Sequence, residues 1–91
     1  MKQLTLLYGD GCGYCKKAKM FLKRALDMHP KYFSLDIQYI NDESEQAEPY
    51  RHELVPAFYC GGALFFEGNP TMDIVMAALN DCYYGDGQTS Q

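Results

Sequence analysis

The chain has 91 residues, 47% of them apolar, and no low-complexity tract, so its composition predicts one small globular domain. Eight basic residues against twelve acidic ones give a formal net charge of −4. This balance argues against nucleic acids and anionic membranes as partners, because both attract basic proteins. No apolar run has the length of a membrane span, and the N-terminus resembles no signal peptide. We therefore expect a cytoplasmic monomer that binds neither nucleic acid nor membrane.

The first predicted elements are a short strand and a long helix joined by glycines. Residues Gln3–Tyr8 form a brief apolar run typical of a buried strand, and Gly9-Asp10-Gly11 is a turn. From Cys12 to about Met28, apolar residues recur every three or four positions, which predicts an amphipathic helix that His29-Pro30 ends. Five of the eight basic residues lie on this helix and predict a solvated face or a surface that steers acidic partners: Lys16, Lys17, Lys19, Lys23 and Arg24.

The middle of the chain predicts a second strand and a short second helix. Residues Tyr32–Ile40 alternate apolar and polar side chains and are rich in aromatic residues, as half-buried strands are. Residues 41–44 offer several helix-capping side chains before a short helix over 45–48. Pro49 is expected either to limit that helix to one or two turns or to displace its start.

The last third of the chain predicts a hairpin and a closing helix. Two apolar runs, residues 57–60 and 63–66, flank Gly61-Gly62, a pattern that indicates a tight hairpin turn. A helix then runs through residues 74–79. The tail, residues 85–91, is polar and rich in glycine, so we expect it to be disordered and residues 1–84 to form a single domain.

The predicted order of elements is therefore β-α-β-α-β-β-α, an α/β fold. Two helical crossovers predict parallel strands, and the hairpin adds an antiparallel edge. The expected architecture is a central four-stranded mixed sheet flanked by helices.

The candidate site is the cysteine pair Cys12 and Cys15, at the junction of the first strand and helix. The first N–H groups of a helix lack intrahelical partners and favour negative charge, so a thiolate at Cys12 is stabilised there. Cys15 lies three positions on, on the same face and nearer the core. We interpret Cys12 as the nucleophile and Cys15 as the resolving thiol of a pair that exchanges between dithiol and disulfide.

Two other interpretations of the cysteines remain. Cys12 and Cys15 could pack as small apolar side chains, or they could supply half of a zinc site, which needs two further ligands at a set spacing. The remaining cysteines, Cys60 and Cys82, stand alone in different elements. Because disulfides in the cytoplasm are transient, we expect these two cysteines to pack in the core, and we predict no metal site.

The order of these motifs resembles a known family. A strand, then Cys-x-x-Cys opening a helix, then Val55-Pro56 before a hairpin, and Gly68 before a closing helix: this arrangement is similar to the thioredoxin-fold superfamily in its compact glutaredoxin-like form. The similarity covers about residues 3–83. It implies a dithiol disulfide oxidoreductase that acts on disulfide-bearing proteins or on glutathione mixed disulfides.

The resemblance also implies roles for individual residues. Pro56 is expected to form a cis peptide bond against the cysteine pair, and the backbone of Val55 is expected to pair with an extended substrate segment. Tyr14 is expected to cover the disulfide. The turn before the last helix is expected to bind a carboxylate of glutathione, through Gly68, Asn69 and Thr71.

The electron donor and one alternative function stay open. Gly13 stands where glutaredoxins carry proline, and Asp10-Gly11 stands where they carry a lysine. Either glutathione, as reductant or co-substrate, or a thioredoxin reductase is therefore a candidate donor, with no cofactor bound. The alternative hypothesis is an iron–sulfur or metal carrier in which Cys12 is a ligand, as in some glutaredoxins.

Overall fold

The computed structural model describes residues 1–85. Four strands, two α-helices and two short 3₁₀ helices follow one another in the order β1 (Leu4–Tyr8), α1 (Gly13–Met28), η1 (Pro30–Ser34), β2 (Ile37–Asn41), η2 (Glu45–Ala47), β3 (Ala57–Cys60), β4 (Ala63–Glu67) and α2 (Met72–Tyr84). The strands form one mixed sheet in the order β2-β1-β3-β4. The predicted four-stranded mixed sheet flanked by helices is thus confirmed.

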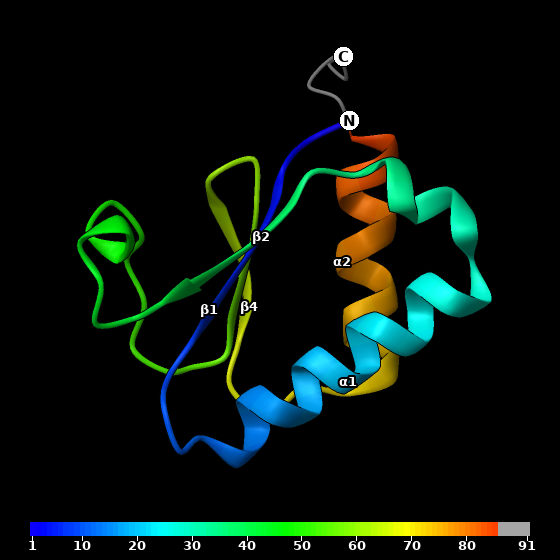
Figure 1. Cartoon of the computed structure of the whole chain (residues 1–91). Coiled ribbons are helices and arrows are strands. Elements are labelled where there is room, and N and C mark those ends of the chain that lie inside the picture. Colours follow the sequence, from blue (N-terminus) through cyan, green and yellow to red (C-terminus); the bar gives the residue numbers. More distant parts are fainter. Residues whose placement is uncertain (86–91) are drawn as a thin grey trace.

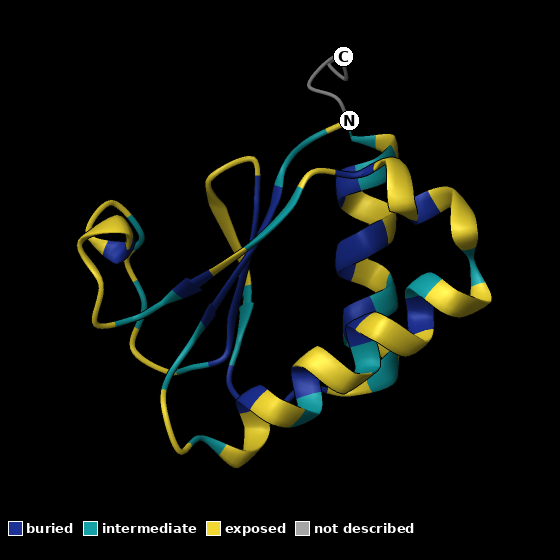
Figure 2. Cartoon of the chain, in the orientation of Figure 1, coloured by how far each residue is buried: buried dark blue, intermediate teal, exposed yellow. Residues whose placement is uncertain are grey.

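The two faces of the sheet are covered differently. Both α-helices lie on one side of the sheet, and the segment that carries η2 lies on the other (Figure 1). The helical side holds the larger apolar cluster, in which Leu4, Leu6 and Phe58 meet Leu22 of α1 and Leu79 of α2. The central strands β1 and β3 are buried almost throughout, and each α-helix turns its buried stripe toward them (Figure 2).

The other face carries a smaller cluster under the η2 segment. Its buried members are Leu7, Ile40, Ala47, Ala57 and Tyr59, with Tyr50 packed against them. Gln38 lies in the same layer and donates hydrogen bonds to Thr5 and to the Tyr50 hydroxyl at 2.8 and 3.0 Å. Because no α-helix covers this face within the described residues, its core is thin.

The region after α1 differs from the predicted strand. The strand predicted over residues 32–40 is wrong in its first half, since Pro30–Ser34 form the 3₁₀ helix η1 and β2 begins only at Ile37. Proline at the first position of η1 presets its helical φ. Tyr32 then points into the core, where its hydroxyl donates to Asn80 at 2.9 Å. The alternation of apolar and polar residues over 32–40 therefore comes partly from Tyr32 and Phe33, which lie in the 3₁₀ helix and not in a strand.

The second crossover also differs from the prediction. Instead of an α-helix over residues 45–48, the chain makes the single 3₁₀ turn η2. Ser44 precedes it without a side-chain capping bond, and Asn41 instead closes a local turn by accepting from the Glu43 N–H at 2.9 Å. The following strand β3 runs antiparallel to β1, so the prediction of a parallel third strand was wrong, while β1 and β2 are parallel as predicted.

Cys60 and Cys82 are joined by a disulfide, which contradicts the prediction that they simply pack. Both are buried, and the bond ties the end of β3 to the last turns of α2. Strand and helix bring together two cysteines that are 22 positions apart in sequence. Sequence spacing alone does not reveal such a pair, because the contact depends on how α2 packs across the sheet.

Helix α2 is the last element of the described residues. The backbone N–H of Gly85 donates to the carbonyl of Asp81 at 2.8 Å and closes the helix. Apart from Gly85, the tail predicted to be disordered lies outside the described residues. Within residues 1–85, neither α-helix has the length and apolar character needed to cross a membrane.

Candidate functional site

Cys12 is the residue that caps the start of α1. The chain leaves β1 at Tyr8 and turns through Gly11, whose φ of +71° is a conformation that glycine adopts without strain. Cys12 has extended backbone angles, and its Sγ accepts a hydrogen bond from the Cys15 N–H at 3.1 Å. The sulfur therefore occupies the position where an unpaired helical N–H and the helix dipole favour an anion.

Cys15 has a contrasting environment one turn into α1. Its side chain is only 2% exposed, and its Sγ accepts from the Gly9 N–H at 3.4 Å. Burial, together with the neighbouring Cys12 sulfur and the charge of Asp42, raises the pKa of the Cys15 thiol to about 11. At neutral pH Cys15 is therefore a protonated thiol. Cys15 is more deeply buried than Cys12, as the sequence predicted, and the two sulfurs also have different hydrogen-bond donors.

Val55 and Pro56 lie against Cys12. The peptide bond between them is cis, as the resemblance implied. The Cys12 thiol donates toward the carbonyl oxygen of Val55, with 3.7 Å between sulfur and oxygen. The carbonyl of Pro56 in turn accepts from the Gly68 N–H at 2.9 Å. The structure thus brings Cys12, Val55, Pro56 and Gly68 together from three separate parts of the chain.

The start of α2 contributes the remaining predicted residues. Thr71 is the N-cap of this helix, and its hydroxyl accepts from the Ile74 N–H at 3.1 Å. Asn69 is exposed, and its side-chain oxygen accepts from Lys17 Nζ of α1 at 2.9 Å. The same ammonium lies 5.7 Å from the ring centroid of Tyr14, which is 51% exposed. Lys17 therefore links the surroundings of the cysteine pair to the turn before α2.

The sequence does not single out Lys17 as a site residue. It is one of five basic residues predicted to form either a solvated face or a surface that steers acidic partners, and it is distinguished here by its hydrogen bond to Asn69. The signal in the sequence is its position two residues after Cys15, which places it on the first turns of α1. The partner residue Asn69 is 52 positions away, so no local pattern predicts the contact.

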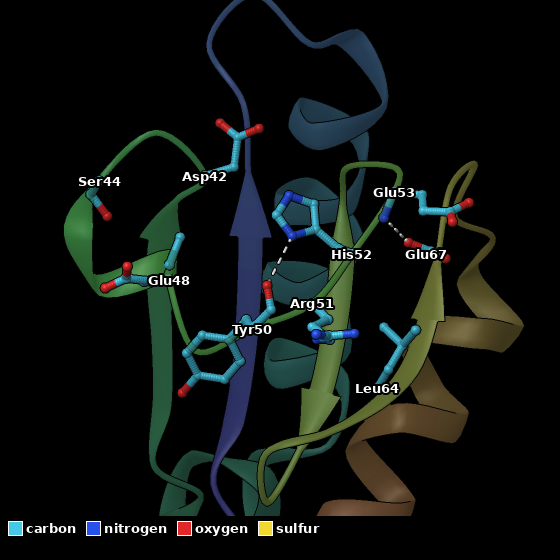
Figure 3. Close-up of a pocket in the computed structure, with 10 residues that line it drawn as sticks. Asp42, Ser44, Glu48, Tyr50, Arg51, His52, Glu53, Leu64 and Glu67 are labelled. Atoms are coloured by element: carbon cyan, nitrogen blue, oxygen red, sulfur yellow. Dashed lines mark hydrogen bonds between the residues drawn. The ribbon is translucent and has the colours of Figure 1, made fainter.

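The largest pocket described lies apart from the cysteine pair. It has a volume of about 710 Å³ and is bounded by the segment of residues 42–53 and by β4. Figure 3 shows its labelled side chains, among them Tyr50, Arg51 and His52, on the sheet face away from the helices. Neither Cys12 nor Cys15 lines it. In the part of the chain that the structure describes, no three His, Cys, Asp or Glu side chains cluster in a way that could hold a metal ion.

Comparison with known proteins gives a match in structure but none in sequence. No protein-family model matches the chain, and no curated protein matches it. Among solved structures, it is similar to the zinc-bound form of human ERp44, a thioredoxin-fold protein, with a TM-score of 0.64 and 15% identity. The match covers 88% of this chain and 26% of ERp44, so the chain spans about a quarter of that protein's length.

The match and the described geometry lead to one conclusion about architecture. The chain has a four-stranded mixed sheet with two α-helices on one face, and its structural neighbour is a thioredoxin-fold protein. The chain has the thioredoxin fold.

Proposed function

We propose that the protein is a dithiol thiol–disulfide oxidoreductase that uses Cys12 and Cys15. The observation that carries this proposal is the unequal environment of the two sulfurs. Cys12 is partly exposed and its Sγ accepts from a helical N–H, whereas Cys15 is buried and its raised pKa keeps it protonated. A nucleophile and a resolving thiol need this difference, because the first must react with an external disulfide and the second must wait for the mixed disulfide.

The reaction begins when the Cys12 thiolate attacks one sulfur of a substrate disulfide. A mixed disulfide forms between Cys12 and the substrate, and the other substrate sulfur leaves as a thiolate. Cys15 then loses its proton to solvent and attacks the Cys12 sulfur. The second substrate sulfur leaves, and the Cys12–Cys15 disulfide remains. Two electrons have passed from the protein dithiol to the substrate.

Val55 is proposed to dock the substrate. Its carbonyl lies 3.7 Å from Cys12 Sγ, so a polypeptide bonded to that backbone holds its own sulfur near the nucleophile. Backbone pairing of this kind gives affinity without depending on particular side chains. We propose disulfide-bearing proteins as the main substrates on this basis.

The donor that reduces Cys12–Cys15 again is proposed to be glutathione or a thioredoxin reductase. In favour of glutathione, Lys17 and the turn of Gly68, Asn69 and Thr71 offer a carboxylate a cation and the start of a helix, where the helix dipole favours negative charge. Turnover measured with glutathione plus its reductase, and separately with thioredoxin reductase, decides between the two donors.

The function is tested by trapping the mixed disulfide. The variant Cys15→Ser, incubated with a peptide disulfide, should accumulate a one-to-one adduct that peptide mapping assigns to Cys12. Cys12→Ser should form no adduct and show no insulin reduction. Turnover that persists in Cys12→Ser would remove the proposal.

A further inference from the structure

Glu67, the last residue of β4, binds the backbone of a distant segment with its side chain. Its Oε1 accepts hydrogen bonds from the N–H groups of two consecutive residues, Glu53 at 2.8 Å and Leu54 at 3.1 Å. Figure 3 shows the first of these bonds at the rim of the pocket. One carboxylate oxygen thus holds the chain immediately before Val55, whose carbonyl faces Cys12.

The segment held by Glu67 has no helix or strand of its own. Residues 48–56 connect η2 to β3 without regular structure. Pairing between β3 and β4 ends at Ala57 and Glu67, and Gly68 adds one bond to the carbonyl of Pro56. Proline has no N–H with which to continue the ladder. The side chain of Glu67 therefore extends the attachment of this segment to β4 past the point where backbone pairing stops.

The bonds to Glu67 are of the strong kind. A carboxylate that accepts backbone N–H groups forms charge-assisted bonds, which are about twice as strong as neutral ones. These two bonds lower the pKa of the Glu67 carboxyl, with a further contribution from the charge of His52. Glu67 is therefore ionised at neutral pH, the state in which it holds the two N–H groups.

Leu54 is the side chain that this arrangement presents to solvent. It is 56% exposed, although it is a large apolar residue. It lies over Gly68, where a Cβ atom would come within 3.4 Å of Leu54 Cδ1. Gly68 has a φ of +107°, which glycine adopts without strain. Because it has no side chain, it leaves room for the Leu54 side chain next to Val55. Leu54 directly precedes Val55, whose carbonyl oxygen lies 3.7 Å from Cys12 Sγ, so a peptide that pairs with the Val55 backbone would pass the exposed leucine side chain.

We propose that Glu67 is a positioning residue, which fixes the backbone at Leu54 just before Val55, whose carbonyl faces Cys12, so that peptides with an apolar residue next to their disulfide cysteine are preferred. This proposal rests on the proposed function, because it assigns the substrate class of the same site. Glu67 takes no part in the exchange of electrons. It acts through the segment that it holds, and Leu54 is the specificity-determining contact.

The test compares two peptides that differ only in the residue before their cysteine, leucine or aspartate, each as a mixed disulfide with 2-mercaptoethanol. For the wild-type protein we expect a lower KM with the leucine peptide. Glu67→Ala should raise that KM about tenfold, as expected for loss of hydrogen bonds to a charged group, with kcat changed less than about twofold. Leu54→Ala should remove the preference between the two peptides.

Conservative and matched variants separate positioning from general stability. Glu67→Gln keeps an oxygen acceptor for both N–H groups, so KM should stay within about threefold of wild type. Glu48→Ala removes another carboxylate at the same pocket and should leave KM unchanged. The alkylation rate of Cys12 by iodoacetamide, measured for each variant, reports whether the nucleophile itself is intact.

Several outcomes would overturn the proposal. One is an unchanged KM in Glu67→Ala, and another is a KM in Glu67→Gln raised as far as in Glu67→Ala. Equal KM values for the two peptides with the wild-type protein would also contradict it. If Glu67→Ala does not fold, Glu67→Gln and Leu54→Ala decide by the same comparison. Loss of turnover in Cys12→Ser with any of these results shows that the proposed function stands while the positioning role fails.

Discussion

The two cysteine pairs of this protein consist of the same residue type but differ in their burial and bonding. Cys12 and Cys15 sit at the start of α1, where one sulfur is partly exposed and faces a helical N–H. Cys60 and Cys82 are both buried and joined across the interface of β3 and α2. Cys12 and Cys15 differ from each other in exposure, whereas Cys60 and Cys82 are both buried. Position in the fold, and not the residue type, therefore separates a pair suited to exchange from one suited to hold the structure.

The largest effect that sharpens this comparison is on turnover. Cys12→Ser should lower insulin reduction by at least about a thousandfold, since loss of a nucleophile removes the covalent step. The double variant Cys60→Ala/Cys82→Ala should keep turnover within about twofold of wild type, because neither residue contacts the described site. Assays at a temperature where both variants are folded make the comparison. Equal loss in both would break the distinction between the two pairs.

The next largest effect is on the free energy of unfolding, which should fall more when Cys60 and Cys82 are replaced than when Cys12 is replaced. The Cys60–Cys82 disulfide joins residues 22 positions apart, and loop-closure entropy predicts that removing it lowers the free energy of unfolding by about 3 kcal/mol. Urea titration of Cys60→Ala/Cys82→Ala against wild type measures this loss. Cys12→Ser, at a half-buried N-cap where serine also caps a helix, should lose less than about 1 kcal/mol. A double variant as stable as wild type would contradict a structural role for the second disulfide.

A third prediction concerns the pH dependence of the resolving step. Burial is the largest of the causes that raise the pKa of the Cys15 thiol to about 11, with the neighbouring Cys12 sulfur and Asp42 adding to it, so its thiolate fraction grows with pH throughout the neutral and mildly alkaline range. Release of a peptide from the Cys12 mixed disulfide should therefore accelerate by up to about tenfold per pH unit between pH 7 and 9. Stopped-flow measurement of peptide release gives the profile. A rate that levels off near pH 7 would mean that Cys15 is not held as a thiol.

The smallest expected effect lies at the rim of the site. Lys17→Ala removes the cation that binds Asn69 and should raise the KM for glutathione by about two- to fivefold, as expected for a partly solvated charge. Lys23→Ala is the matched control, since Lys23 lies on the same helix and pairs with Asp27 instead. Steady-state assays at low and high salt measure both variants. An equal change of KM in the two variants would mean that Lys17 acts only through the general positive charge of the helix surface.

Local patterns in the sequence predicted the parts of the fold that local forces determine. The apolar spacing of α1, its start at Cys12 and its end before Pro30 depend on residues near one another in sequence, and the structure has them. Residues 30–34 and 45–47 differ because their aromatic and capping residues suit more than one conformation. In both places the packing of the folded chain favours a 3₁₀ turn.

The site was predictable to the extent that its residues form motifs. Cys12, Cys15 and Pro56 belong to a pattern that can be recognised along the chain, and the structure brings them together. The contacts of Lys17 and Glu67, and the disulfide of Cys60, join residues between 13 and 52 positions apart. Such contacts follow from how strands and helices pack, so the one-dimensional sequence carries no periodic signal for them.

The measurement that tests the central claim most directly is a redox titration that follows both cysteine pairs in the same molecule. The wild-type protein is equilibrated with mixtures of reduced and oxidised glutathione, its free thiols are alkylated, and mass spectrometry of peptides gives the state of each pair. We predict that Cys12 and Cys15 pass together from disulfide to dithiol within the glutathione range, while Cys60–Cys82 stays oxidised throughout. Two pairs that titrate together, or a Cys12–Cys15 pair that never forms a disulfide, would contradict the account.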